Sequence, residues 1–145
     1  MDAAQTLGRA QLFHRMSNEY LERLARSARE RHYTAGETIL REGDPGIAFF
    51  VIAEGHVEVL RGAGSDQSVI NTLGPTDSFG EMALLNDLPR MATVRAVDAV
   101  TCIALLHLDL LDALRDQPEI AMHMLKNMGA LLRRAEERAA KAAAG

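Results

Sequence analysis

The stretch that decides the fold reads Phe79-Gly-Glu-Met-Ala-Leu-Leu-Asn-Asp-Leu-Pro-Arg-Met-Ala-Thr-Val-Arg-Ala96. A Gly-Glu pair opens it, Arg90 follows nine residues after Glu81, and a strand-like run closes it. Small and apolar side chains fill the middle, which leaves backbone N–H groups free to face a ligand. We expect the rest of the chain to build, line and cover this turn.

The residue types in this stretch suit a compact anion that also carries hydroxyl groups. Gly80 has no Cβ and lets a ligand approach the backbone closely, and a helical turn starting over 82–85 would favour an anion at its N-terminal amides. Arg90 offers a planar fork of donors that matches phosphate oxygens. Glu81 can accept from a hydroxyl or hold Arg90 in place. Alternatively, these two residues form a surface ion pair that contributes little to stability.

The remaining chain predicts a single domain over residues 1–145 that is mainly β with flanking helices. Apolar residues recur at helical spacing over 5–29, with Ser17 as an N-cap that divides the segment. Short alternating runs separated by turn residues fill 31–107 and predict a small antiparallel barrel or jelly roll. Helical spacing returns over 109–138, where the last helix has an apolar arc wider than one contact requires.

The stretch over 79–96 resembles the phosphate-binding cassette of cyclic nucleotide-binding domains, the module of protein kinase A regulatory subunits and catabolite-activator proteins. Arg41-Glu-Gly-Asp-Pro-Gly46 and the run from Phe50 to Val59 are similar to the first barrel strands of that family. The resemblance extends over about residues 10 to 135. It implies an antiparallel β jelly-roll barrel with N-terminal helices and a C-terminal lid helix.

The resemblance also implies which residues bind the ligand. Glu81 would accept from the ribose 2′-hydroxyl, and Arg90 would pair with the cyclic phosphate. The other implied cassette contacts are Gly80, Met82, Ala83, Met91 and Ala92. The implied apolar wall is Val59, Ile70 and Leu73, and the implied lid residues are Met128, Leu131 and Leu132.

Position 91 departs from the family pattern, in which Ala, Ser or Thr usually follows the arginine. A serine or threonine there is associated with contacts to guanine, whereas Met91 offers only an apolar surface and a weak acceptor. The expected ligand is therefore cyclic AMP rather than cyclic GMP, with no further cofactor. Met91 also supports an alternative in which the pocket takes no cyclic nucleotide.

Composition and charge exclude several other classes of protein. The formal net charge is −4 and the basic residues are scattered, so we expect no direct DNA binding. Five separated histidines argue against a cupin-type metalloenzyme, and we expect no catalytic or metal site. Cys102 lies in an apolar run as a buried thiol. No apolar segment reaches membrane-spanning length and no signal peptide begins the chain, which favours a cytoplasmic location.

These observations predict a cyclic nucleotide-binding regulatory domain that signals when its C-terminal helix closes over the ligand. Two alternatives remain open. The chain could be a ligand-independent protein-interaction module of the same fold, or a regulatory domain cut from a larger protein. The wide apolar arc of the last helix also predicts a homodimer along that helix.

Overall fold

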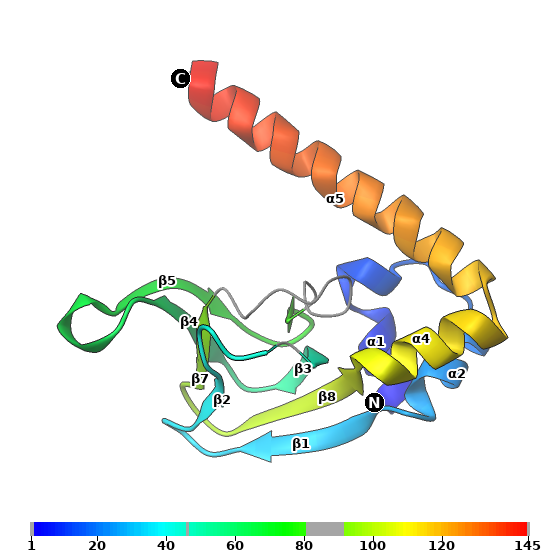
Figure 1. The fold of residues 1–145 in the computed structure, drawn as a ribbon, viewed down its shortest axis with the longest axis horizontal. Helices are drawn as coiled ribbons and strands as arrows, with labels where there is room; N and C mark the ends of the chain where they lie inside the picture. The colour runs from blue at the N-terminus through cyan, green and yellow to red at the C-terminus, as the bar shows by residue number, and fades with distance from the viewer. Residues whose placement is uncertain (1, 46, 81–91, 145) are drawn as a thin grey trace.

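Two four-stranded antiparallel sheets dominate the computed structural model, which describes residues 2–45, 47–80 and 92–144 (Figure 1). Sheet A has the strand order β1 (Arg29–Tyr33), β8 (Val100–Leu106), β3 (Ala48–Glu54) and β6 (Ser78–Phe79). Sheet B has the order β2 (Thr38–Leu40), β7 (Thr93–Ala96), β4 (Val57–Arg61) and β5 (Ser68–Leu73).

The mainly β class with antiparallel strands and flanking helices is confirmed, and the two sheets of the expected jelly roll are not closed into a barrel. Among the described residues, every strand pairing lies within one sheet and none joins an edge of sheet A to an edge of sheet B. Side chains between the two sheets, rather than a continuous backbone ladder, therefore hold them together.

The inner strands β3 and β8 of sheet A are largely buried, because helices cover the face that points away from sheet B, whereas the edge strand β1 is mostly exposed. Along β3, Phe49 and Val51 pack into a cluster with the helices, whereas Phe50 and Ile52 pack into the cluster between the sheets. This alternation is the period of two expected for a strand. The Phe49 ring also meets the Phe13 ring edge-on, with centroids 5.6 Å apart. The molecule thus has three layers: helices, sheet A and sheet B.

The helical layer is built from segments that precede and follow the strands in the sequence. Its elements are α1 (Ala3–Gly8), the 3₁₀ turn η1 (Gln11–Phe13), α2 (Asn18–Ala25), α4 (His107–Asp116) and α5 (Glu119–Ala144). The N-terminal segment is broken into separate short helices, one of the two arrangements expected. Ser17 occupies the N-cap position of α2, but its side chain makes no capping hydrogen bond. The helix expected to reach residue 29 ends at Ala25, and Arg29 already belongs to β1.

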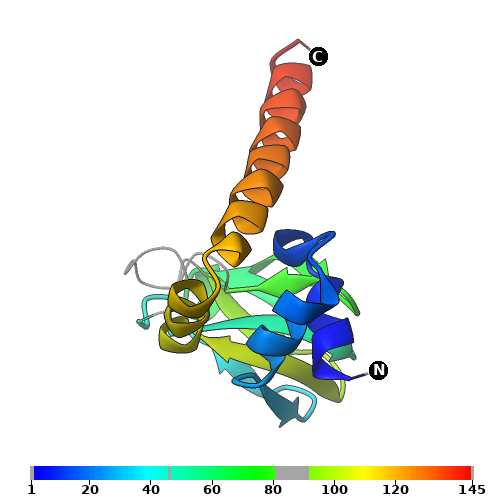
Figure 2. The same ribbon diagram turned by 90° about the vertical axis from the view of Figure 1, so that its right-hand side faces the viewer.

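Helix α5 is longer than the sequence pattern predicted. It continues past residue 138 to Ala144, through an alanine-rich segment whose residues have high helix propensity. Figure 2 shows that α5 starts against the N-terminal helices and then rises away from the rest of the molecule. All side chains from Leu132 to Ala144 are exposed. Only the first turns of α5 therefore belong to the helical layer.

Candidate functional site

The two ends of the predicted cassette are attached to different sheets. Gly80 follows β6 at the edge of sheet A and has a φ of 81°. This left-handed conformation favours glycine, because a Cβ would be strained there. Just before it, the Phe79 ring stacks on Phe50 with centroids 5.0 Å apart and planes 10° apart. The stack fixes the position at which the chain leaves sheet A.

The chain returns at Ala92, which is half-buried and leads into β7 of sheet B. In the register of that sheet, Thr93 lies opposite Leu60 and Val94 lies opposite Val59. The cassette therefore spans from an edge of sheet A to an inner strand of sheet B. Five predicted ligand contacts lie outside the described residues: Glu81, Met82, Ala83, Arg90 and Met91.

The three predicted wall residues lie on β4 and β5 but differ in burial. Val59 and Leu73 both pack against the cluster between the sheets. Leu73 lies opposite Val57, which is two residues from Val59, so the two wall residues share the inward face of sheet B. Ile70 has no partner in the register, because a bulge separates the pairs Val59–Asn71 and Leu60–Val69, and it is 50% exposed. The predicted wall is therefore packed against the core at Leu73 and exposed to solvent at Ile70.

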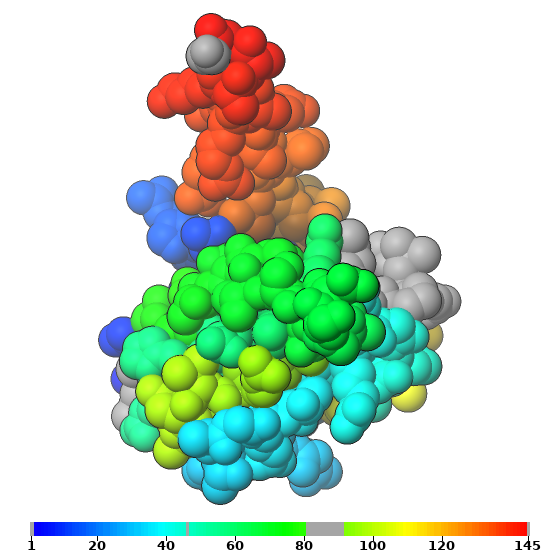
Figure 3. Space-filling view, turned by 90° about the vertical axis from the view of Figure 1, so that its left-hand side faces the viewer, coloured from blue at the N-terminus to red at the C-terminus, as the bar shows by residue number. Residues whose placement is uncertain are grey.

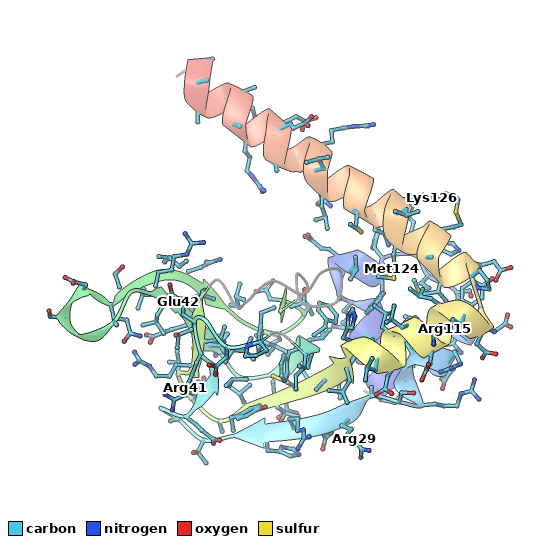
Figure 4. All side chains as sticks on the ribbon, viewed as in Figure 1. Arg29, Arg41, Glu42, Arg115, Met124 and Lys126 are labelled. Carbon is cyan, nitrogen blue, oxygen red and sulfur yellow. The ribbon has the colours of Figure 1, made fainter. Side chains whose placement is uncertain are left out.

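Glu42 connects the end of β2 to the return of the cassette. Its backbone N–H donates to the Thr93 hydroxyl at 3.0 Å, and its carboxylate accepts from the Gly62 N–H at 3.0 Å. Figure 4 shows Arg41 and Glu42 at the end of the sheets that lies far from Met124 and Lys126 on α5. The conformation of the loop after β2 is thus coupled to both Thr93 and the β4–β5 hairpin, a role that the sequence pattern did not assign to Glu42.

The predicted lid residues do not cover sheet B in this structure. Met128 is half-buried and packs against the core cluster of the helical layer. Leu131 is half-buried, and Leu132 is 61% exposed. Figure 3 shows the distal part of α5 standing above the surface of the β4–β5 hairpin. Of the three predicted lid residues, Met128 is the one that packs against a core cluster, and that cluster belongs to the helical layer.

A pocket of about 530 Å³ opens on the β1–β2 side of the two sheets, and none of the predicted site residues that the structure describes lines it. Its apolar part includes Ile39, Leu40 and Phe50. Burial raises the pKa of the Tyr33 hydroxyl in the same lining. Opposite charges are mixed around the pocket, which includes Arg31, Arg41, Glu37 and Asp44. The pocket therefore shows no preference for an anionic or a cationic ligand.

The turns that join the two sheets at the other end are held by a His–Asp pair. The Asp98 carboxylate accepts from the backbone N–H of His56 at 2.7 Å and lies 2.8 Å from its Nδ1. The hydrogen bond from the His56 side chain is the main cause that lowers the pKa of Asp98. Between the sheets, burial raises the pKa of Cys102 to about 12, so this thiol is protonated and inert near neutral pH.

Neither a metal-ligand cluster nor a membrane-spanning helix is found in the described parts of the chain. Within 2–45, 47–80 and 92–144, no group of three or more His, Cys, Asp or Glu side chains could hold a metal ion. None of the helices in those ranges is both long and apolar enough to cross a bilayer.

Curated relatives share the part of the chain that carries the sheets. The family model of the cyclic nucleotide-binding domain matches residues 30–117 of this chain. A cAMP-dependent protein kinase regulatory subunit from Dictyostelium discoideum is 44% identical over 78 residues, which cover 51% of this chain and 24% of that protein. A cyclic AMP receptor protein from Thermus thermophilus is 32% identical over 126 residues, or 86% of this chain and 58% of that protein. The chain thus spans less than two thirds of the length of these relatives.

Solved structures show the same arrangement of sheets and helices. The N-terminal domain of a transcriptional regulator from Streptomyces coelicolor superposes with a TM-score of 0.83 at 32% identity, covering 92% of this chain and 94% of that domain. The regulatory domain of Toxoplasma gondii protein kinase A, solved with cAMP, superposes with a TM-score of 0.69 at 27% identity. The superposition covers 79% of this chain and 42% of that chain. The family match covers more than half of the chain and agrees with the fold, so this protein belongs to the cyclic nucleotide-binding domain family.

Proposed function

We propose that this domain binds cyclic AMP between the cassette and sheet B and signals through a change in the position of α5. The observation that carries the proposal is how the two ends of the cassette are attached to the sheets. Gly80 leaves sheet A with a positive φ, and the chain returns through Ala92 into β7, where Thr93 and Val94 lie opposite Leu60 and Val59 of sheet B. A ligand held by residues 80–92 would therefore meet the apolar inward face of β4 and β5.

The roles of the cassette residues follow from the chemistry of the ligand. Arg90 would pair with the cyclic phosphate, because its planar fork matches two phosphate oxygens. Glu81 would accept from the ribose 2′-hydroxyl, and the backbone at Met82, Ala83 and Ala92 would support the phosphate. The cyclic nucleotide named for the relatives is cAMP in the regulatory subunits and receptor proteins, while a cGMP-dependent protein kinase from Eimeria tenella is 41% identical over 85 residues.

Cyclic AMP is favoured over cyclic GMP because of the residue after Arg90. Guanine presents more hydrogen-bonding groups than adenine to a hydroxyl side chain at that position. Met91 has no hydroxyl and only a weakly accepting sulfur. Desolvating guanine against it would leave polar groups unpaired, which costs free energy.

Closure of α5 would provide the signal. The exposed Ile70 and the incompletely buried Leu131 and Leu132 leave apolar surface on both sides of the expected ligand position. A ligand that contacts both surfaces only in a closed state would shift the population toward that state. Met128 would then cover the base together with these leucines.

A homodimer along α5 is also proposed, because a second stripe of the helix is free. Met122 and Leu125 are 57% and 60% exposed and lie one helical turn apart on the first turns of α5. Such a stripe can pack against its copy in a second helix. Sedimentation or light scattering should show a mass that rises with concentration, and Leu125→Glu should return it to one chain of 15.8 kDa. A constant monomer mass for the parent protein would contradict the dimer.

Calorimetric titration with cyclic AMP and cyclic GMP tests the binding proposal. We expect one saturable site per chain and tighter binding of cyclic AMP. The protein should show a cooperative thermal transition beforehand, so that a negative result is not caused by unfolding. Folded protein that gives no heat with either nucleotide would contradict the proposal and favour the ligand-independent interaction module.

A further inference from the structure

The first turns of α5 are anchored to the N-terminal helices by a continuous apolar contact. Ile120 is fully buried and Met124 is 3% exposed, and both lie in one cluster with Leu12, Phe13 and Met16. Moving this part of α5 away would expose most of these side chains to water, which is unfavourable in proportion to their apolar area.

Asn127 adds a polar anchor at the end of this contact. Its side-chain amide donates to the Leu12 carbonyl at 2.8 Å and to the His14 carbonyl at 3.0 Å. Both carbonyls flank the end of η1, where Arg15 has a φ of 61°, an uncommon value for a residue other than glycine. The two hydrogen bonds thus fasten α5 to a turn with a well-defined and demanding conformation.

The junction between α4 and α5 is fastened as well. Asp116 accepts from the Arg23 guanidinium at 2.8 Å, and the Gln117 side chain donates to Glu19 at 3.2 Å. Both contacts join the end of α4 to α2. A rotation of all of α5 about residues 117 and 118 would have to break the contacts of Asn127 and expose the Ile120 cluster.

Beyond Met128, the last residue of α5 that packs against this cluster, the helix reaches Gly129, a residue that weakens it. Gly129 has lower helix propensity than almost any other residue, and a Cβ added there would meet no atom within 4 Å. The helix face that carries Met124 and Met128 continues as Leu131 and Ala135, at the spacing of one helical stripe. That stripe therefore extends past the last anchored turn without a binding surface of its own.

We infer that α5 bends at Gly129, so that residues 119–128 remain fixed to the N-terminal helices through Asn127 while residues 130–144 move toward β5. This inference rests on the proposed function for the identity of the ligand. It differs from motion of the whole helix about the α4–α5 junction, because the anchored turns contribute a fixed support.

Distances between pairs of spin labels separate the two kinds of motion. The distal pair joins Ala139→Cys to Thr72→Cys on β5, and the matched proximal pair joins Glu119→Cys to the same position; all three sites are exposed. Cys102 is fully buried with a raised pKa, so the native thiol should not take the label. Residue 139 lies about 15 Å beyond Gly129 along the helix, so a bend of about 40° would move it by about 10 Å.

Without nucleotide, the distal pair should show a broader distance distribution than the proximal pair, and Gly129→Ala should narrow it. With saturating cyclic AMP, the distal distance should shorten while the proximal distance stays unchanged. Asn127→Leu should broaden the proximal distribution, whereas the exposed control Lys126→Ala should not.

Equal widths for both pairs without nucleotide, or equal shifts of both pairs with it, would overturn the bend at Gly129. A broad distal distribution that Gly129→Ala narrows, in protein that binds no cyclic nucleotide, would support the bend and reject the proposed ligand. The two hypotheses can therefore fail separately.

Discussion

Strands β3 and β5 both carry β-branched apolar side chains but lie in opposite environments. In β3, the five residues from Ala48 to Ile52 are all buried, because helices cover one face of sheet A and sheet B covers the other. In β5, only Leu73 is partly buried, and Val69 and Ile70 are each 50% exposed. The apolar side chains of β3 are thus covered by neighbouring layers, whereas those of β5 are largely exposed to solvent.

The difference indicates a division of roles within the domain. Sheet A and the helical layer form a frame that positions the ends of the cassette at Gly80 and Ala92. β5 and the distal part of α5 present apolar surface that a ligand, a closing helix or a second chain would cover. Substitutions in the frame should therefore act on folding, whereas substitutions on β5 should act on binding.

The largest expected effect is that of Phe49→Ala in the frame. The ring is fully buried between sheet A and the N-terminal helices, so its removal should lower the free energy of unfolding by about 3–5 kcal/mol. The control Val69→Ala on β5 should change it by less than about 0.5 kcal/mol. Urea denaturation measures both, and equal losses would refute the contrast between the two strands.

A pair of glycine substitutions sharpens the contrast at the turn that joins sheet A to sheet B. Gly55 and Gly43 have φ values of 88° and 89°, but an added Cβ would lie 2.2 Å from the Ala99 carbonyl oxygen only at Gly55. Gly43→Ala should cost about 1–2 kcal/mol from its backbone conformation alone. Gly55→Ala should cost about 1–3 kcal/mol more, because the clash forces the turns apart.

Thermal and urea unfolding of the two variants compare these costs. If Gly55→Ala were no less stable than Gly43→Ala, the close approach of the β3–β4 and β7–β8 turns would not exist in solution. The contact between Gly55 and Ala99 would then not contribute to joining the two sheets.

On β5, Ile70→Val should separate binding from stability. The side chain is half exposed, so the free energy of unfolding should change by less than about 0.5 kcal/mol. If Ile70 contacts the ligand, losing one buried methylene should weaken cyclic AMP binding about fourfold, since it contributes about 0.8 kcal/mol. Titration of the variant measures this, and an unchanged affinity would remove Ile70 from the wall.

The smallest effect concerns the pH dependence of the His56–Asp98 pair. The pKa of Asp98 is lowered in the folded state by the hydrogen bond from His56. Its contribution to stability should be present above the unfolded aspartate pKa of about 3.9 and be lost as the pH falls through the lower folded value. Asp98→Asn should therefore reduce the acid-dependent loss of stability below about pH 4.

Melting temperatures of parent and variant between neutral and acidic pH provide the measurement. The exposed control Asp112→Asn should follow the parent curve. Parallel curves for parent and Asp98→Asn would show that the pair does not hold the turns together.

The sequence predicted the fold where its local patterns were strong. The continuous apolar run before Gly55 correctly indicated a strand, because a strand between two layers needs apolar residues on both faces. The alternating run after Gly55 correctly indicated a second strand. That the two sheets are not closed into a barrel could not be predicted, since strand alternation does not reveal whether the outer strands of two sheets pair. The break after Ala25 was also missed, because helical spacing in 5–29 continued into residues that pair with β8 instead.

The candidate site was predictable only in part for a related reason. Val59, Ile70 and Leu73 were expected as a wall from the family resemblance, whereas the bulge that leaves Ile70 unpaired depends on the register with β4. The contacts of Asn127 span 115 and 113 residues along the chain, and no local pattern marks them. Glu42 was missed for the same reason, because its partner Thr93 is 51 residues away.

The measurement that tests the central claim most directly is a titration of cyclic AMP into the parent protein, Arg90→Ala and the matched control Arg41→Ala. The account predicts saturable binding to the parent, a similar affinity for Arg41→Ala, and at least about a 30-fold loss for Arg90→Ala, because an unpaired buried phosphate costs about 2 kcal/mol or more. Equal affinities of the parent and Arg90→Ala, with both proteins folded, would contradict a cyclic nucleotide site in this cassette.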